Sequence, residues 1–149
     1  MNASPDMLEQ NKESALTLIQ TISTIPQAYP RSLNTCGRVA VHPSGRWVVV
    51  SNRGHDSIAI FKSHASQNYM LTPATLFHTR GETPRHFQFD KSGEYLFVAN
   101  QDTNNVAVFR FNQSTGKATF TDHQYRCYSP NFVQIMSPSV EPKWLNPKL

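Results

Sequence analysis

The sequence lacks the features of a membrane-spanning or exported protein. Its longest apolar run is residues 95–99, whereas a membrane-spanning helix needs about 20 consecutive apolar residues. The first six residues, 1–6, are mostly polar and show no basic region followed by an apolar one, as a signal peptide would. We therefore expect no membrane partner and a cytoplasmic location.

Cysteine and clustered charge are also scarce. Cys36 and Cys127 are the only two cysteines and form no CxxC motif, which excludes a disulfide scaffold and predicts buried, reduced thiols. The histidines show no metal-ligand spacing, so we expect no metal. The 14 Lys and Arg residues occur singly, whereas nucleic-acid-binding proteins usually cluster them on a stripe. We expect no nucleic-acid partner.

Aromatic residues, in contrast, are frequent. The 149 residues include 9 Phe, 5 Tyr and 2 Trp, and only 16% of the chain is charged. This composition argues against disorder and against a coiled coil. It favours one folded domain that is rich in β-strands.

The chain contains an internal repeat with an offset of 48 residues. Residues 39–52 match 87–100, and the match continues without a gap until 58–61 aligns with 106–109. A period of 40 to 50 residues with several short strands is typical of a β-propeller blade. The repeat therefore predicts two successive blades.

Each copy is predicted to form a four-stranded antiparallel meander. A first strand around 86–89 alternates polar and apolar residues, and a turn follows in which Gly45 or Gly93 takes a positive φ. The remaining strands are expected at 47–51, 57–62 and 74–79 in the first copy, and at 95–99, 105–112 and 118–123 in the second. The predicted fold class is all-β, a propeller fragment of two complete blades with flanking strands.

The flanks of the repeat divide the chain into three parts. We predict a flexible segment at 1–15, a partial propeller at 16–136 and an irregular, proline-containing tail at 137–149. Residues 16–24 are expected to form the outer strand of a preceding blade, with a helix over 7–20 as the alternative. Residues 131–136 are expected to form the first strand of a following blade. Since propellers need about four to eight blades, either further blades are missing here, or copies self-associate, or the sheet edges stay exposed.

The meander also predicts which loops share one rim. Four segments fall on the same end of the blades, namely 52–56, 79–85, 100–104 and 124–127, while the Ser-Gly turns fall on the opposite end. The shared rim is rich in Arg, His, Asp, Asn and Gln. Such side chains bind anionic, hydroxyl-rich ligands through charge-assisted hydrogen bonds.

Three segments of this rim and its strands carry a resemblance. Residues 51–61, which include Asn-Arg-Gly-His-Asp-Ser, together with 81–87 and 98–109, resemble the closing blades of the lactonase family with a seven-bladed β-propeller. That family includes propeller-type 6-phosphogluconolactonases and fungal carboxy-muconate cyclases. The resemblance covers about residues 16–136 and implies that the N-terminal blades of a full ring are absent from this sequence.

The resemblance implies a catalytic set of Arg53, His55 and Arg85. Opening a lactone requires stabilisation of the carbonyl oxyanion and a group that moves a proton, and a substrate phosphate favours arginine. We assign Arg85 to the oxyanion or carboxylate, Arg53 to the phosphate or lactone oxygen, and His55 to proton handling or positioning. The expected substrate-binding residues are Arg38, Asn52, Asn100 and Gln101.

One position departs from the family pattern. Members commonly carry an acidic residue where this chain has Arg38, and this change removes a candidate base. Structural roles also remain open for the arginines and His55 in the loops. Asn52 and Asn100 recur at equivalent places, which favours a role in the turns.

Two functional hypotheses follow. The first is a cofactor-independent hydrolase of the 6-phosphogluconolactonase type, which acts on a small anionic sugar lactone in carbohydrate metabolism, in the pentose phosphate pathway. The alternative is a non-catalytic, truncated propeller that serves as a binding or assembly module.

Overall fold

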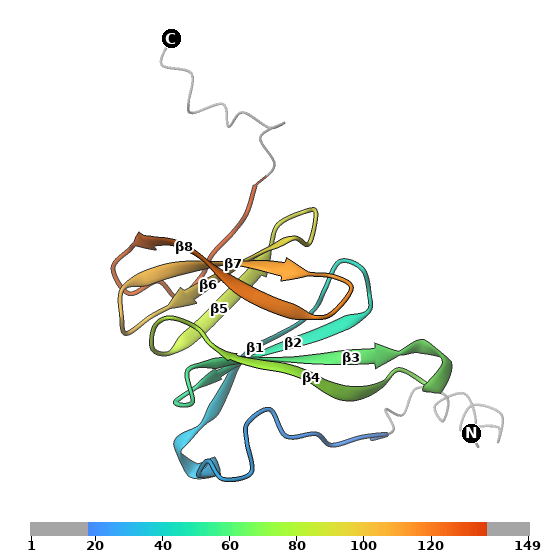
Figure 1. Ribbon diagram of the computed structural model, residues 1–149. Helices are drawn as coiled ribbons and strands as arrows, with labels where there is room; N and C mark the ends of the chain where they lie inside the picture. Colours follow the sequence, from blue (N-terminus) through green and yellow to red (C-terminus); the bar gives the residue numbers. More distant parts are fainter. Residues whose placement is uncertain (1–17, 137–149) are drawn as a thin grey trace, which may run out of the picture.

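The computed structural model describes residues 18–136, which form two four-stranded antiparallel sheets (Figure 1). Sheet A contains β1 (Thr35–Val41), β2 (Trp47–Arg53), β3 (Ser57–His64) and β4 (Met70–His78), in this order. Sheet B contains β5 (Pro84–Phe89), β6 (Tyr95–Asn100), β7 (Asn105–Asn112) and β8 (Lys117–Arg126). The short 3-10 helices η1 (Arg31–Leu33) and η2 (Ala65–Gln67) are the only helical elements of the described residues. The predicted pair of four-stranded antiparallel blades is confirmed.

The two sheets repeat one another in detail. The pairing of β1 with β2 shifts register between Cys36 and Val39, and the pairing of β5 with β6 shifts between Pro84 and His86. These bulges lie 48 residues apart, as the sequence repeat does. The turns that follow contain Gly45 and Gly93 with φ of 72° and 74°, which confirms the predicted positive φ.

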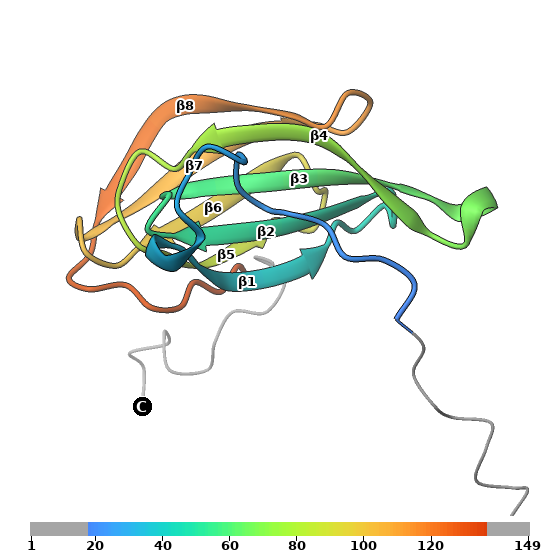
Figure 2. The same ribbon diagram turned by 90° about the horizontal axis from the view of Figure 1, so that it is seen from below.

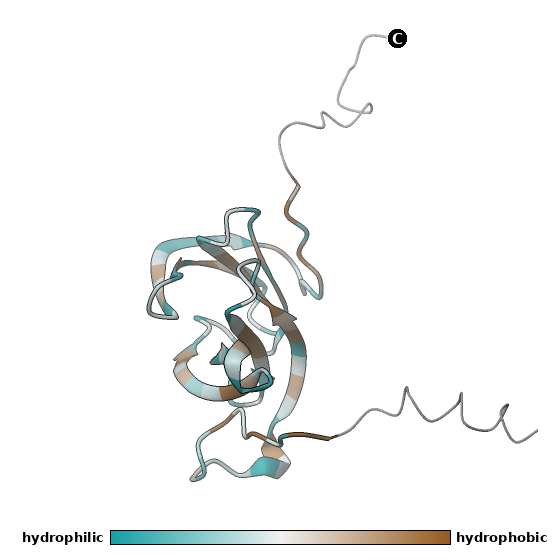
Figure 3. Ribbon diagram, turned by 90° about the vertical axis from the view of Figure 1, so that its right-hand side faces the viewer, coloured by the Kyte–Doolittle hydropathy of each residue, from teal (hydrophilic) through white to brown (hydrophobic). Residues whose placement is uncertain are grey.

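The main hydrophobic core lies between the sheets, where Figure 3 shows strongly hydrophobic strands. Sheet A contributes Trp47, Val49, Ile58 and Ile60, and sheet B contributes Phe87, Phe89, Leu96, Val98, Ala107, Phe109 and Phe111. The equivalents of the sheet A residues in sheet B include Tyr95, Phe97 and Val108, which line a hollow on the opposite face of sheet B. The two sheets therefore pack through opposite faces, so that equivalent faces of both sheets point in the same direction, as in successive propeller blades.

The outer face of sheet A is covered by the segment before β1. Val50, Ala59 and Phe61 form a second cluster against which Ile22 packs, and in Figure 2 this segment (blue) crosses sheet A. The prediction of a strand at 16–24 is wrong for residues 18–24, which have no strand conformation. The side chain of Gln20, rather than a backbone ladder, donates to Leu71 O and accepts from Leu71 N–H, both at 2.8 Å.

The predicted strand at 131–136 is also wrong, because this segment has no strand conformation. Its contact with β5 runs through a side chain, since the Val133 N–H donates to the His86 ring at 3.3 Å. Residues 18–20 are not helical. The rest of the alternative helix, the predicted flexible segment 1–15 and the tail 137–149 lie outside the described residues. No helix among residues 18–136 has the length and hydrophobicity to cross a membrane.

Candidate functional site at the loop end of the blades

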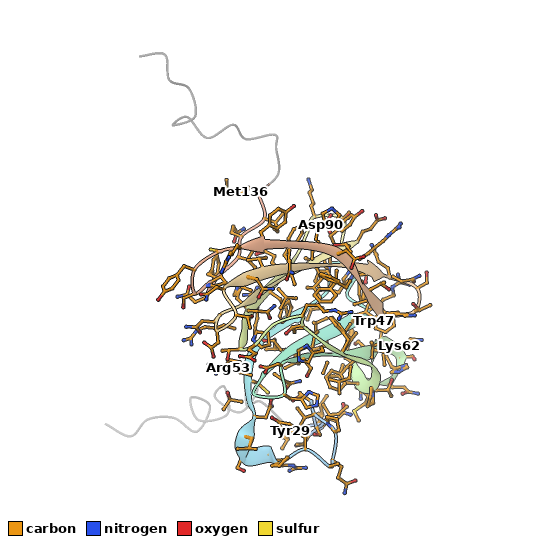
Figure 4. All side chains as sticks on the ribbon, turned by 60° about the vertical axis from the view of Figure 1, so that its left-hand side comes forward. Tyr29, Trp47, Arg53, Lys62, Asp90 and Met136 are labelled. Carbon is orange, nitrogen blue, oxygen red and sulfur yellow. The ribbon has the colours of Figure 1, made fainter. Side chains whose placement is uncertain are left out.

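The predicted rim loops come together at one end of the two sheets. The Asp56 carboxylate, in the β2–β3 loop, accepts a hydrogen bond from the Thr83 N–H at 2.8 Å. The carbonyl of Thr83 in turn accepts from the Gln101 N–H at 3.0 Å, and the Asn104 carbonyl accepts from the Cys127 N–H at 3.0 Å. These bonds join all four predicted segments, so the common rim is confirmed. In Figure 4, Arg53 lies at this end and Lys62 at the other.

Arg85 is held at the rim by a neutral partner. It lies in the β5 bulge, outside the regular ladder, and its side chain is exposed. Its Nη1 donates to Gln101 Oε1 at 3.1 Å, and Gln101 Nε2 donates to Ser129 Oγ at 3.4 Å. An amide oxygen does not neutralise the guanidinium, so Arg85 keeps its full positive charge.

Arg53 ends β2 and is also bound to a neutral oxygen. Its Nη2 donates to the Cys36 carbonyl at 3.1 Å, while its Nε is buried without a hydrogen-bond partner. Cys36 and Cys127 are both exposed and are not bonded to each other. The prediction of buried thiols is therefore wrong, because both residues lie next to the rim rather than in the core.

His55 is fixed in the β2–β3 loop. Its Nδ1 lies 2.7 Å from Ser57 Oγ, and its backbone N–H donates to Asn34 Oδ1 at 3.2 Å. The ring of Tyr29 packs edge-on against the imidazole, with ring centroids 4.7 Å apart. The half-buried ring thus has a defined orientation, as a proton-handling residue requires.

Asn52 and Asn100 point into the protein. Both are fully buried. Asn52 Nδ2 donates to the Thr24 carbonyl at 2.8 Å and to Ser57 Oγ at 3.2 Å, and Asn100 Nδ2 donates to the Thr79 carbonyl at 3.0 Å. In this structure they hold the loops, and any effect on a ligand would act through loop position.

Arg38 meets a residue that the sequence analysis missed. Its Nη1 lies 2.6 Å from Nε2 of His86, and its guanidinium lies over the Phe87 ring at 5.8 Å. Burial and the neighbouring charge of Arg38 lower the pKa of His86 below its ordinary value of 6.5. The repeat offered the signal that was overlooked, since Arg38 and His86 are 48 residues apart and occupy equivalent positions on β1 and β5, the inner strands of the two blades.

The site is therefore basic and offers no metal centre among the described residues, which contain no group of three His, Cys, Asp or Glu side chains suited to an ion. Three arginines lie on the inner strands or the rim, together with two histidines: Arg38, Arg53, Arg85, His55 and His86. Such a set binds anionic oxygens and moves protons.

Comparison with known proteins agrees with this architecture. The model of the family "Lactonase, 7-bladed beta-propeller" matches residues 2–135. The chain is 31% identical over 137 residues to an uncharacterized protein of Lactococcus lactis, which covers 91% of this chain and 39% of the relative. It is 34% identical over 101 residues to the 6-phosphogluconolactonase of Bacillus subtilis, covering 68% of this chain and 28% of the relative.

A solved structure shows the same relationship. The crystal structure of a putative 6-phosphogluconolactonase from Bacteroides fragilis aligns with a TM-score of 0.61 and 34% identity, over 64% of this chain and 27% of that one. The fold and the family match together define a β-propeller of the lactonase type. This chain belongs to the lactonase family with a seven-bladed β-propeller. It spans about two fifths or less of the length of these relatives.

Proposed function

We propose that this chain acts as a lactone hydrolase that opens 6-phosphogluconolactone, in the pentose phosphate pathway and in the cytoplasm. The relative from Bacillus subtilis that is named for this activity supports the proposal. The basic rim agrees with a substrate that carries a phosphate and develops an oxyanion. No cofactor is needed for this hydrolysis.

One observation carries the proposal. Arg53 and Arg85 are each held by a neutral oxygen, the Cys36 carbonyl and the Gln101 amide. A carboxylate partner would have neutralised these charges, whereas neutral partners fix the side chains and leave the charges for an anionic substrate.

The proposed roles follow from position. Arg85, which is exposed in the β5 bulge, stabilises the oxyanion that develops when water attacks the lactone carbonyl. Arg53 binds the phosphate or the ring oxygen of the lactone. His55, oriented by Ser57, handles the proton of the attacking water or of the leaving hydroxyl.

The test is hydrolysis of 6-phosphogluconolactone by the purified chain, measured above the spontaneous rate. Arg85→Ala should abolish most of the acceleration, and Lys62→Ala should retain it, because Lys62 is an exposed cation at the other end of the sheets. Absence of acceleration in well-folded protein would contradict the proposal.

A further inference from the structure

The contacts of the His86 ring contain a hydrogen-bonding conflict. Arg38 Nη1 lies 2.6 Å from its Nε2, and the Val133 N–H points at its Nδ1 from 3.3 Å. A guanidinium and a backbone N–H can only donate, while a neutral imidazole has a lone pair on one nitrogen and a hydrogen on the other. One of the two donors therefore always faces an N–H group of the ring.

The surroundings of the ring add to the surplus of donors. Arg38 Nε is buried and has no hydrogen-bond partner, although buried polar groups are normally paired. His86 is only 6% exposed, and the Phe132 ring packs on it with centroids 4.2 Å apart. Figure 2 shows the segment after β8 returning along the edge formed by β1 and β5. The mismatch between donors and acceptors at His86 therefore lies in a partly enclosed place, where water does not readily supply the missing acceptor.

We propose that Arg38 and His86 form an oxyanion-binding subsite, which takes the phosphate group of the lactone or the carboxylate of its ring-opened product. When the two side chains move apart, an oxyanion that enters beside them accepts from Arg38 and from Nε2–H of a neutral His86. The Nδ1 lone pair then accepts the Val133 N–H, so both donors that face the ring have an acceptor. This tautomer change needs no net proton.

The inner strands leave space on the Arg38 side of the pair. A hollow of about 190 Å³ opens between β1 and β5, lined in part by Arg38, Phe87 and Gln88. The lowered pKa of His86 keeps the ring neutral near pH 7, as the proposed tautomer requires. The inference rests on the proposed function in taking the oxyanion to belong to the lactone substrate or to its ring-opened product, and it gives Arg38 a role in binding rather than as a base.

The test uses the full chain with ¹⁵N-labelled histidine, titrated separately with inorganic phosphate and with acetate. We expect saturable binding of at least one anion and a shift of the His86 ring nitrogens to the Nε2–H tautomer. Binding of phosphate alone identifies the phosphoryl group as the ligand, and binding of acetate alone identifies the carboxylate. If neither anion shifts the His86 resonances, the inference is wrong.

Variants test whether anion binding depends on Arg38 and His86. Arg38→Met should weaken anion binding by about tenfold or more, as expected for loss of a charge-assisted hydrogen bond, whereas Lys62→Met should leave it unchanged. Arg38→Lys keeps the charge and should retain part of the affinity, and His86→Gln, which retains a donor, provides a second variant if Arg38→Met does not fold. Equal affinity in folded Arg38→Met and the parent chain would overturn the inference.

Hydrolysis of 6-phosphogluconolactone by the same samples separates this inference from the proposed function. Hydrolysis that is unchanged by Arg38→Met and His86→Gln, without anion binding at His86, overturns the subsite alone. Anion binding that depends on Arg38, in protein that does not accelerate hydrolysis, overturns the proposed hydrolase and supports the anion-binding site.

Discussion

His42, in the turn between β1 and β2, is hydrogen-bonded to Gly93, in the turn between β5 and β6. The His42 Nε2 lies 2.9 Å from the Gly93 carbonyl oxygen, and the ring packs edge-on against Phe89, with centroids 4.7 Å apart. The β1–β2 turn and the β5–β6 turn have equivalent sequences but different surroundings. The β5–β6 turn contacts His42 of the other turn, whereas nothing lies within 4 Å of a Cβ added at Gly45 in the β1–β2 turn.

This relationship predicts different costs for two matched substitutions. Gly93→Ala places a Cβ 2.5 Å from His42 Nε2 at a φ of +74°, while Gly45→Ala at a φ of +72° has nothing within 4 Å. The left-handed backbone alone costs about 1–2 kcal/mol for alanine. We therefore expect Gly45→Ala to lower the free energy of unfolding by about this amount, and Gly93→Ala to lower it further because buried His42 must move.

Chemical denaturation of both variants measures the difference. His42→Ala removes the ring that the new Cβ would meet. In a His42→Ala background, Gly93→Ala should therefore lower the free energy of unfolding only by about as much as Gly45→Ala does in the parent chain. Equal destabilisation by the two glycine substitutions would show that the His42 contact does not constrain the second turn.

The sequence predicts features that are set within one blade, and it does not predict contacts between the blades and their flanking segments. The repeat identified the strands, the turns and the common rim, because each of these depends on local periodicity and on the meander. It did not reveal the segments around 18–24 and 131–136, where side chains such as Gln20 and His86 replace a backbone ladder. The repeat placed Arg38 and His86 at equivalent positions, but it did not reveal their contact, which depends on how the two sheets pack.

Trp47 and Tyr95 provide a second matched pair, since they occupy equivalent positions. Trp47 is 3% exposed in the core between the sheets and donates from Nε1 to the Gln113 carbonyl at 3.0 Å, whereas Tyr95 is 39% exposed. Trp47→Ala should lower the free energy of unfolding by about 3–5 kcal/mol. Tyr95→Ala should cost about 1 kcal/mol or less, and thermal denaturation of both variants would check this. Similar losses would mean that the open face of sheet B is covered in solution.

Stability should fall as the pH is lowered through the range in which histidine titrates. Burial lowers the pKa of His42, with a further contribution from Arg46, against the opposing effects of the Gly93 carbonyl and Asp90. Since the folded state binds this proton less readily than the unfolded state, which titrates near 6.5, stability is complete above that pH. It is lost as the pH falls toward the lower, folded pKa.

Urea denaturation between pH 8 and pH 5 measures this dependence. His42→Gln should flatten it, and a residual slope should remain because the pKa of His86 is lowered as well. A slope that His42→Gln does not alter would exclude His42 as its source.

The partners of Arg85 predict how its charge and its orientation contribute to hydrolysis. Arg85→Ala should lower kcat for 6-phosphogluconolactone by about 10²–10³, the effect of removing one oxyanion donor. Arg85→Lys retains the charge and a donor but loses the planar fork, so its kcat should fall by less. Gln101→Leu leaves Arg85 intact but removes the acceptor that holds it at 3.1 Å, so a smaller loss in kcat is expected. Initial rates measured across substrate concentrations separate kcat from KM. If Gln101→Leu lowers kcat as much as Arg85→Lys, position rather than donor geometry limits the reaction. If none of the variants changes kcat, Arg85 does not stabilise the oxyanion.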